Sequence, residues 1–418
     1  MTSVWLAFQE IFLPWVATEL KALSKGAVMN GNSYDVVIVG GGVMGCSIAY
    51  HLKKADPRLK LVVIERDPSY QYASTTLSMG GVRVQFSLRE NILISMYALQ
   101  VLKHFEEEMS VEGEKPDIGF HQEGYLFLID REGEKAARSS LALQKELGAE
   151  VQWWSPDELK ERFSLLDASR WVGGTFGPKD GYLDAYAFLM AYRAKARSLG
   201  AEFINDNVVS LEKQGGTLSG VKLASGKKLE SRVVVNAAGA WSTEVAKTAE
   251  VKLPVEPVKR QVFAFKSAVA LDKPLPLIIP PSGHYFRTET GGLLLVGRSF
   301  DDDPVGFDLT LDKSRFQNIL WPELAELVPA FDSLKLVRGW AGLYDVNRLD
   351  GNAILGQWPE LRGLYIVCGF SGHGLQQAPA AGRYLSELIL GITPSFDLGI
   401  FSPVRILEGR PLSEAGLV

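Results

Sequence analysis

The sequence predicts a doubly wound α/β domain that carries an inserted α+β domain built on an antiparallel sheet. A buried strand, a glycine-rich turn and a helix follow one another over 34–55, and a second apolar strand over 59–65 continues the alternation. From 251 to about 336 the sequence pattern changes, because prolines become frequent and short predicted strands dominate. At 418 residues the chain is long enough for two domains with a sizeable core.

The glycine-rich turn carries the strongest chemical signal. Gly40, Gly42 and Gly45 follow the first strand at the spacing G-x-G-x-x-G. The first glycine allows a tight turn, the second lets the backbone approach a pyrophosphate, and the third lets the helix pack on the strand. The helix N-terminus adds free N–H groups and a positive dipole end. Glu65 ends the second strand, where a ribose hydroxyl needs an acceptor. The sequence therefore predicts a Rossmann-type dinucleotide site.

The later elements support two intertwined domains. Helices are expected over 88–109, 184–199 and 375–390 and from a capping box that starts at Ser155, and strands over 124–130, 201–209, 232–239, 261–265, 284–287, 293–297 and 364–368. A second glycine-rich turn, 369–374, precedes the last helix. The predicted division is an apolar extension (1–33), a nucleotide-binding domain (34–114, 166–250 and 337–400), a second domain (115–165 and 251–336) and a tail (401–418).

Composition excludes several classes of function. A net charge of −5 argues against a positively charged surface that would bind nucleic acid. No histidine or cysteine cluster in the sequence has metal-ligand spacing. Cys46 and Cys368 both fall in apolar elements, so we expect buried thiols in a reducing compartment. These observations predict a cytoplasmic protein without a metal site.

The first residues form an unusual apolar segment. Residues 3–23 carry Trp5, Phe8, Phe12 and Trp15 near helical spacing, but acidic residues and a proline interrupt the run. The segment has no basic start, so it resembles neither a membrane span nor a secretory signal. Three interpretations remain open: packing on its own body, docking on a partner subunit, or lying on a membrane surface. The last would place the protein peripherally at the inner face of a membrane.

Four motifs in order resemble those of the D-amino-acid oxidase superfamily of FAD-dependent oxidoreductases. They are the 40–45 turn, the loop 74–83, the run 237–241 and the turn 371–376. The nearest likeness is to the branch of sarcosine oxidase, glycine oxidase, dimethylglycine dehydrogenase and dye-linked proline dehydrogenase. The chain also resembles mitochondrial FAD-dependent oxidoreductase-domain proteins linked to respiratory complex I assembly. The resemblance covers roughly 34–405.

The resemblance implies FAD as cofactor and a set of residues around it. They are Gly40, Gly42, Val43, Met44, Glu65, Arg66, Ser74, Thr75, Gly80, Gly81, Val208, Ala238, Gly239, Gly342, Gly372, His373, Gly374, Leu375 and Gln376. Backbone N–H groups at the start of the last helix would stabilise the negative edge of reduced flavin. His373 is interpreted as a residue that shapes this backbone, not as a catalytic base.

Departures from the family pattern carry further expectations. Gly342 stands where sarcosine oxidase has the cysteine that attaches flavin, and the loop 74–81 lacks the histidine that dimethylglycine dehydrogenase uses. FAD should therefore be bound without a covalent link. Leu295 stands where sarcosine oxidase keeps an oxygen-activating lysine. Without that cation, forming superoxide has no electrostatic partner, so electrons should pass to a carrier rather than to oxygen.

Arg83 and Tyr344 are the candidates for substrate contact. Arg83 matches the arginine that binds the amino-acid carboxylate in sarcosine oxidase, and a guanidinium suits a carboxylate. A structural ion pair is the alternative for Arg83, and core packing is the alternative for Tyr344. His284, Tyr285 and Arg298 are weaker candidates to line the pocket.

The predicted function is an FAD-dependent dehydrogenase that oxidises a small amino acid or secondary amine, such as sarcosine or proline, by hydride transfer to flavin N5. The partners would be this small molecule and an electron-accepting carrier. The alternatives are a 2-hydroxy-acid dehydrogenase of the same superfamily, an amino-acid oxidase that produces hydrogen peroxide, and a weakly catalytic flavoprotein assembly subunit.

Overall fold

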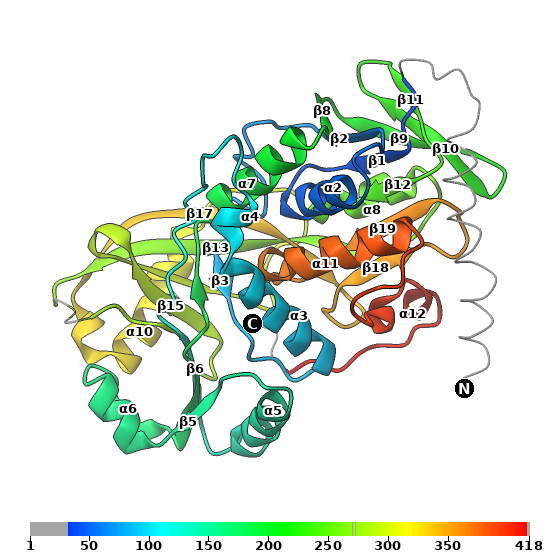
Figure 1. Cartoon of the computed structure of the whole chain (residues 1–418). Coiled ribbons are helices and arrows are strands. Elements are labelled where there is room, and N and C mark those ends of the chain that lie inside the picture. The colour runs from blue at the N-terminus through cyan, green and yellow to red at the C-terminus, as the bar shows by residue number, and fades with distance from the viewer. Residues whose placement is uncertain (1–31, 270, 272, 416–418) are drawn as a thin grey trace.

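The computed structural model describes residues 32–269, 271 and 273–415, and two large sheets organise them (Figure 1). The apolar segment 3–23 lies outside the described residues, so its three interpretations stay predictions. None of the described helices is long and apolar enough to cross a membrane. Cys46 and Cys368 are both buried, as expected.

The first sheet has six strands in the order β18-β19-β12-β1-β2-β8. Their bounds are β1 Val36–Val39, β2 Leu61–Glu65, β8 Glu202–Asn205, β12 Val234–Asn236, β18 Ile354–Gln357 and β19 Leu364–Cys368. All neighbours pair in parallel except β18 and β19. Runs of buried, β-branched residues build these strands because both faces of the sheet are covered.

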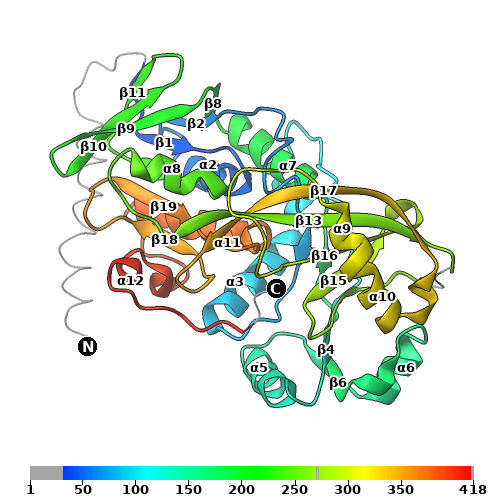
Figure 2. The ribbon, with the colours of Figure 1, turned by 180° about the vertical axis from the view of Figure 1, so that it is seen from behind.

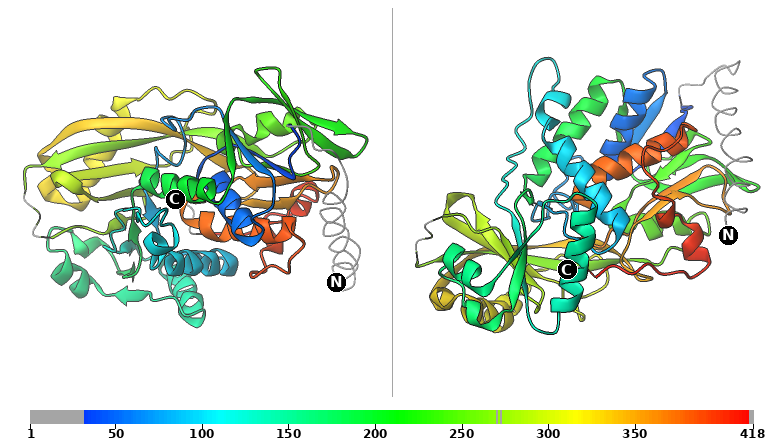
Figure 3. Two further views of the ribbon diagram at one scale, coloured as in Figure 1. Left: turned by 45° about the horizontal axis from the view of Figure 1, so that its top comes forward. Right: turned by 60° about the horizontal axis from the view of Figure 1, so that its bottom comes forward.

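Alternation along β1 divides the core of this sheet. Val36 and Ile38 pack under four helices, α2 Val43–Ala55, α3 Arg89–Leu102, α7 Ala185–Ser198 and α11 Gly374–Ile389. Val37 and Val39 face the other way, toward a three-stranded sheet and a short helix. These are β9 Val208–Gln214, β10 Thr217–Leu223, β11 Lys228–Glu230 and α8 Ser242–Lys247. Figure 3 shows the two layers on either side of the sheet.

The second sheet has eight strands in the order β17-β13-β16-β15-β14-β4-β6-β5. Their bounds are β4 Tyr125–Ile129, β5 Gln152–Trp154, β6 Gly173–Gly177, β13 Val255–Ser267, β14 Leu277–Ile279, β15 His284–Glu289, β16 Leu293–Arg298 and β17 Leu334–Asn347. One face packs on α6 Pro156–Arg162 and α10 Trp321–Leu327 with the turns around them, while the short α9 Lys313–Arg315 precedes this layer and buries no residue (Figure 2). The long strands β13 and β17 run along the molecule and bring this sheet to the first one.

The remaining elements are short, apart from the 13-residue helix α5 Glu134–Glu146. They are β3 Gly81–Val82, which pairs with β7 Gly181–Tyr182, the helices α4 Phe105–Glu108, α5 and α12 Val404–Leu407, a π-helical turn Phe316–Leu320, and 3₁₀ turns at Ala168–Arg170, Gly239–Trp241, Thr290–Gly292, Pro329–Asp332 and Gly399–Phe401. The capping box predicted at Ser155 is confirmed, since its hydroxyl accepts from the Glu158 N–H while Glu158 accepts from the Ser155 N–H.

The predicted fold class is confirmed, while two predicted elements are corrected. The helix expected over 88–109 is broken, because α3 ends at Leu102 and only the short α4 follows. The strand expected over 201–209 divides at Asp206 and Asn207 into β8 and β9, which belong to different sheets. Asp and Asn favour such turns through their short polar side chains. The domain boundaries stay a prediction.

Candidate active site

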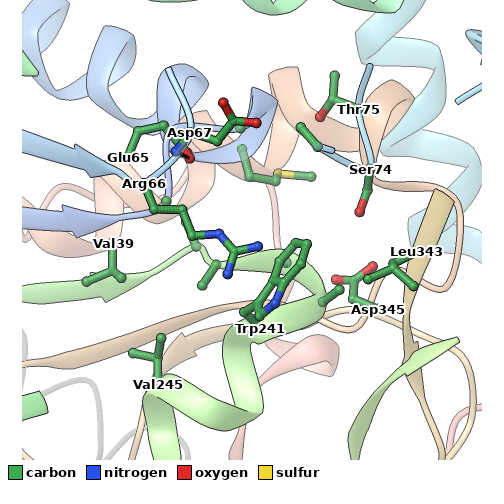
Figure 4. A pocket seen from close by; sticks show the side chains of 18 of the residues that line it. Val39, Glu65, Arg66, Asp67, Ser74, Thr75, Trp241, Val245, Leu343 and Asp345 are labelled. Carbon is green, nitrogen blue, oxygen red and sulfur yellow. Dashed lines mark hydrogen bonds between the residues drawn. The ribbon is translucent and has the colours of Figure 1, made fainter. Parts of the chain in front are cut away.

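A cavity of about 740 Å³ lies at the carboxyl ends of β1, β2 and β12, where doubly wound sheets bind their ligands. Figure 4 shows that β1 and β2 supply Val39 and Glu65 at one end, while β17 supplies Leu343 and Asp345 at the other. The cavity therefore stretches from the first sheet toward the second, as an elongated dinucleotide requires.

The glycine-rich turn has the geometry of a phosphate cradle. Gly40 has φ +98°, and a Cβ there would lie 2.5 Å from the carbonyl oxygen of Ala237. A Cβ on Gly45 would lie 1.9 Å from the carbonyl oxygen of Gly40, so only glycine lets α2 pack this close to the turn. A Cβ on Gly42 would meet nothing nearer than Thr75 Oγ1 at 3.8 Å. The absence of a side chain at Gly42 is therefore not required by protein packing. It leaves space in which a ligand can approach the backbone.

The start of α2 faces the cavity as an anion site. Among the described residues no side chain caps this helix at Gly42, although Thr75 Oγ1 accepts a long hydrogen bond of 3.4 Å from the Val43 N–H. Glu65 holds the turn, since its Oε2 accepts from the Gly41 N–H at 2.7 Å. The uncapped N–H groups and the helix dipole favour a phosphate at this point.

An aromatic stack joins three separate segments at the edge of the cavity. The Arg66 guanidinium lies 3.8 Å from the ring centroid of Trp241, and both side chains line the cavity (Figure 4). The Phe307 ring stacks on Trp241 with a centroid distance of 5.4 Å and an angle of 13° between the rings. Phe307 lies in the loop 299–312 after β16, so a segment of the second sheet reaches the nucleotide end of the site.

A second cavity, of about 40 Å³, adjoins the first and shares Ser74, Ser78, Leu343 and Tyr344 with it. Its other lining residues are Leu77, Met79, Arg260, Val262, Tyr285 and Gly342.

Two tyrosines and one ion pair form the polar part of the small cavity. Burial first, and then the hydroxyl of Tyr344, raise the pKa of Tyr285 well above its ordinary value, so Tyr285 remains a protonated phenol. The Arg260 guanidinium is held by Asp303, with Nη1 and Oδ2 2.6 Å apart. The cavity is thus mostly apolar and aromatic, with one guanidinium at its wall.

Arg83 lies apart from both of these cavities and is 3% exposed. Its Nη1 donates to the carbonyl oxygen of Gln85, and its Nη2 lies 3.1 Å from His373 Nε2. Its backbone N–H donates to Gln376 Oε1 at 2.7 Å. Burial, and then the charge of Arg83, lower the pKa of His373 to about 3, so His373 is neutral and its Nε2 accepts from Arg83.

One buried and one half-buried carboxylate also lie near this region. Asp180 accepts from the Val84 N–H at 3.0 Å and from Gln85 Nε2 at 3.2 Å, and burial raises its pKa to about 7. Asp345 lines the large cavity, and burial raises its pKa to about 6. Desolvation is the first cause in both cases.

Leu295 lies on the face of the second sheet that packs against Met79 of the loop 74–83. It pairs with Ala264 across β13 and packs with Val262 and Met79. Its neighbours in sequence, Leu294 and Val296, belong to the opposite, helix-covered face. Val262 and Met79 also line the small cavity. Leu295 therefore places an apolar side chain beside this cavity.

The residues expected from the sequence fall into three groups. Those that line the large cavity are Gly40, Gly42, Val43, Met44, Glu65, Arg66, Ser74, Thr75, Val208, Ala238, Gly239, Tyr344, Gly372, Gly374 and Leu375. Gly342 lines the small one, together with Tyr344. Gly80, Gly81, Arg83, His373 and Gln376 are not among the described residues that line either of these cavities. His284 and Arg298 instead meet Glu323 in an ion cluster on the α10 side.

Sequence reasoning missed several lining residues, above all Asp345, Phe370, Tyr70 and the segment 206–207. Asp345 directly follows Tyr344, but no local sequence signal indicates that both neighbours line the cavity, as the structure shows. No group of three or more potential metal ligands occurs in the part of the chain that the structure describes.

Comparison with known proteins identifies the family. Residues 35–388 match the family described as FAD dependent oxidoreductase, DAO. The chain is 40% identical to FAD-dependent oxidoreductase domain-containing protein 1 of Xenopus laevis, over 92% of this chain and 85% of that protein.

Two enzymes show more distant similarity. Glycine oxidase of Geobacillus kaustophilus (strain HTA426) is 28% identical, over 89% of this chain and 97% of that protein. The crystal structure of L-proline dehydrogenase from P. horikoshii superposes with a TM-score of 0.82 at 28% identity, over 91% of this chain and 100% of that one.

The site fits the cofactor that the family name implies. The turn at Gly42 leaves room for a pyrophosphate, the start of α2 is uncapped by the described side chains, and Glu65 lines the cavity one strand away. These are the features that bind the diphosphate and ribose of a dinucleotide. The chain belongs to the DAO family of FAD-dependent oxidoreductases, and FAD is its cofactor.

Proposed function

We propose that the protein is a dehydrogenase that oxidises a small amino acid or secondary amine, such as sarcosine or proline, and passes the electrons to a carrier. The observation that carries this proposal is the small cavity that adjoins the cofactor cavity, with its aromatic and apolar lining. Similarity to proteins named glycine oxidase and L-proline dehydrogenase supports an amino acid or amine as substrate.

FAD would supply the redox chemistry, since its flavin N5 accepts the hydride that leaves the α-carbon. The protein's task is then to exclude water and to orient the substrate. An apolar cavity disfavours the charged ammonium, so the amine would release its proton to solvent water on entering and become a better hydride donor. The hydride transfer itself then needs no protein base. This agrees with the lowered pKa of His373, which makes it a weak base, and with the protonated state of Tyr285.

The substrate carboxylate would be bound by a guanidinium. Arg83 is the residue proposed from the sequence, and its partners would have to give way, because it already bonds Gln85 and His373. Arg260 is a second guanidinium at this region and lines the small cavity directly. Tyr344, which lines both cavities, is proposed to face the substrate.

The choice of dehydrogenase over oxidase rests on Leu295. A buried lysine beside the flavin would stabilise superoxide as it forms, whereas Leu295 is an apolar residue, 3% exposed, that packs with Val262 and Met79. Its cross-strand partner Arg287 donates to the Met79 carbonyl oxygen. Slow reaction with oxygen would leave a carrier as the electron acceptor. A cytoplasmic location, with a peripheral position at the inner face of a membrane as the alternative, belongs to the same proposal.

The experiment is anaerobic bleaching of the bound flavin with a panel of substrates. Sarcosine, proline, glycine and dimethylglycine represent the amines, and lactate and 2-hydroxyglutarate represent the 2-hydroxy acids. Bleaching by amines alone supports the proposal. Bleaching by hydroxy acids alone would make the protein a 2-hydroxy-acid dehydrogenase. No bleaching by any compound would favour a weakly catalytic flavoprotein subunit.

A further inference from the structure

Asp345 is a half-buried carboxylate whose hydrogen bonds from other described residues all go to one of its two oxygens. Its Oδ2 accepts from the N–H groups of Gly369 and Phe370, at 2.7 and 3.3 Å. No other described residue donates to its Oδ1, the remaining donor near the carboxylate being the N–H of Asp345 itself, and the side chain lines the large cavity. Asp345 thus directs one acceptor oxygen into the space that the cofactor fills.

Burial makes this arrangement costly unless the ligand completes it. Desolvation is the largest influence on the Asp345 pKa, and the groups that oppose it are backbone N–H groups only, with no cation among them. A carboxylate that loses water at one oxygen must gain a donor there or become protonated. The phosphates of FAD bring no donor, and a second anion beside them would be unfavourable. The partner must be a hydroxyl or N–H of the cofactor.

The position of Asp345 selects the flavin half of FAD. Figure 4 shows Glu65 and Arg66 near one end of the cavity, and Asp345 with Leu343 and Ser74 at the other. Thr75, next to Ser74, contacts the first N–H group of α2, where the pyrophosphate binds. Asp345 therefore lies just beyond the pyrophosphate on the side away from the adenosine. The ribityl chain joins the pyrophosphate to the flavin ring and carries hydroxyl donors.

We propose that Asp345 is a cofactor-binding residue whose Oδ1 accepts a hydrogen bond from a ribityl hydroxyl of FAD. The other oxygen anchors the turn between β19 and α11, so one side chain ties the ribityl chain to the turn that precedes the second helix N-terminus. This inference requires that FAD is bound, and it does not depend on the substrate.

The substitution Asp345→Asn separates the two roles of the side chain. The amide oxygen still accepts from Gly369 and Phe370, while the amide nitrogen replaces the acceptor in the cavity with a donor. Dilution of the purified holoprotein, followed by flavin fluorescence, gives the Kd for FAD. Displacement of FAD by ADP gives the Kd for ADP, which contains only the adenosine half and the diphosphate.

The expected result is a Kd for FAD that rises by roughly 10- to 100-fold in Asp345→Asn, the range for losing a hydrogen bond to a charged group. The Kd for ADP should stay within about twofold, since ADP lacks the ribityl chain. Asp345→Ala, with a smaller side chain, should likewise raise the Kd for FAD and leave the Kd for ADP within about twofold. The same loss should persist with N3-methyl-FAD, which keeps the ribityl hydroxyls but lacks the ring N3–H.

Four results would overturn the inference. An unchanged or lower Kd for FAD in Asp345→Asn would show that the carboxylate only holds the turn. An equal rise for ADP, or a loss that disappears with N3-methyl-FAD, would move the contact to another part of the cofactor. Ser371→Ala is the control, because the Ser371 hydroxyl lies in the same turn, where it donates to the Gly369 carbonyl oxygen and accepts from the N–H of Asn347 at the end of β17. Equal weakening of FAD binding by Ser371→Ala would attribute the effect to the turn alone.

Discussion

Replacing Gly42 by alanine should weaken FAD binding without disturbing the protein. Gly42 has φ −63°, which any residue adopts, and an added Cβ would lie no closer than 3.8 Å to another protein atom. The methyl group instead occupies the space above the start of α2, where the pyrophosphate must approach the backbone. Pushing the diphosphate away from these N–H groups costs one or more charge-assisted hydrogen bonds, each about 1.5–3 kcal/mol.

That loss corresponds to a rise of roughly 10- to 100-fold in the Kd for FAD, at about 1.4 kcal/mol for each factor of ten. The matched control is Gly45→Ala, whose Cβ would lie 1.9 Å from the Gly40 carbonyl oxygen. Here the helix must move away from the turn, and such overpacking costs about 1–3 kcal/mol of folding free energy. Gly45→Ala should therefore lower the melting temperature of the protein even without FAD.

The assay combines a fluorescence titration with FAD and thermal melts with and without the cofactor. Without FAD, Gly42→Ala should have the same melting temperature as the wild type. Added FAD should raise the melting temperature of Gly42→Ala by less than that of the wild type. Wild-type affinity for FAD in Gly42→Ala would refute the assignment of this turn to the pyrophosphate. A lower melting temperature of Gly42→Ala without FAD would refute the conclusion that Gly42 serves the ligand and not the packing.

Three further predictions concern the cofactor link, the substrate and stability. Because Gly342 replaces an attachment residue, acid precipitation should release yellow flavin into the supernatant; flavin that stays in the pellet would contradict this. Arg83→Met should raise the substrate KM while FAD stays bound, by an amount that corresponds to about 2–3 kcal/mol; a rise in the control Arg260→Met alone would move the role to Arg260. Asp180 has a raised pKa of about 7, so it costs stability as the pH rises from the unfolded pKa near 4 to about 7. Denaturant unfolding of Asp180→Asn should show a smaller loss of stability over this pH range than the wild type, and parallel curves would refute it.

The parts of the site that the sequence predicts are those that lie at strand ends. Gly40, Glu65, Ala238 and Leu375 come from distant segments, yet all follow strands of one parallel sheet. The carboxyl ends of parallel strands meet at one edge, so local strand and turn signals are enough to bring these residues together. The same logic predicted the fold class.

The parts that the sequence does not predict depend on pairing over long distances. Arg260 reaches the small cavity because β13 pairs with β17 in a register that sets Arg260 opposite Gly342. Residues 268–333 separate the two strands, so no tight hairpin turn fixes this register and it cannot be counted from the sequence. The stack of Phe307 on Trp241 depends on a loop between elements, which no periodicity describes.

Arg83 illustrates a different limit. Its motif position indicates a carboxylate ligand, but the structure shows its guanidinium bonded to the Gln85 carbonyl and to His373. A sequence motif shows which residue is present and not the hydrogen bonds that its side chain makes. The assignment of Arg83 to the substrate stays a prediction.

Reoxidation of the reduced flavin in a stopped-flow instrument is the most direct test of the proposed dehydrogenase activity. The protein, reduced anaerobically by an amine substrate, is mixed either with air-saturated buffer or with an artificial dye. We predict slow reoxidation by oxygen and fast reoxidation by the dye, because an apolar side chain, Leu295, stands at the position expected for an oxygen-activating lysine. Leu295→Lys should speed the oxygen reaction, and Leu295→Met, of similar volume, should not. Wild-type reoxidation by oxygen as fast as by the dye would contradict the account and make the protein an oxidase.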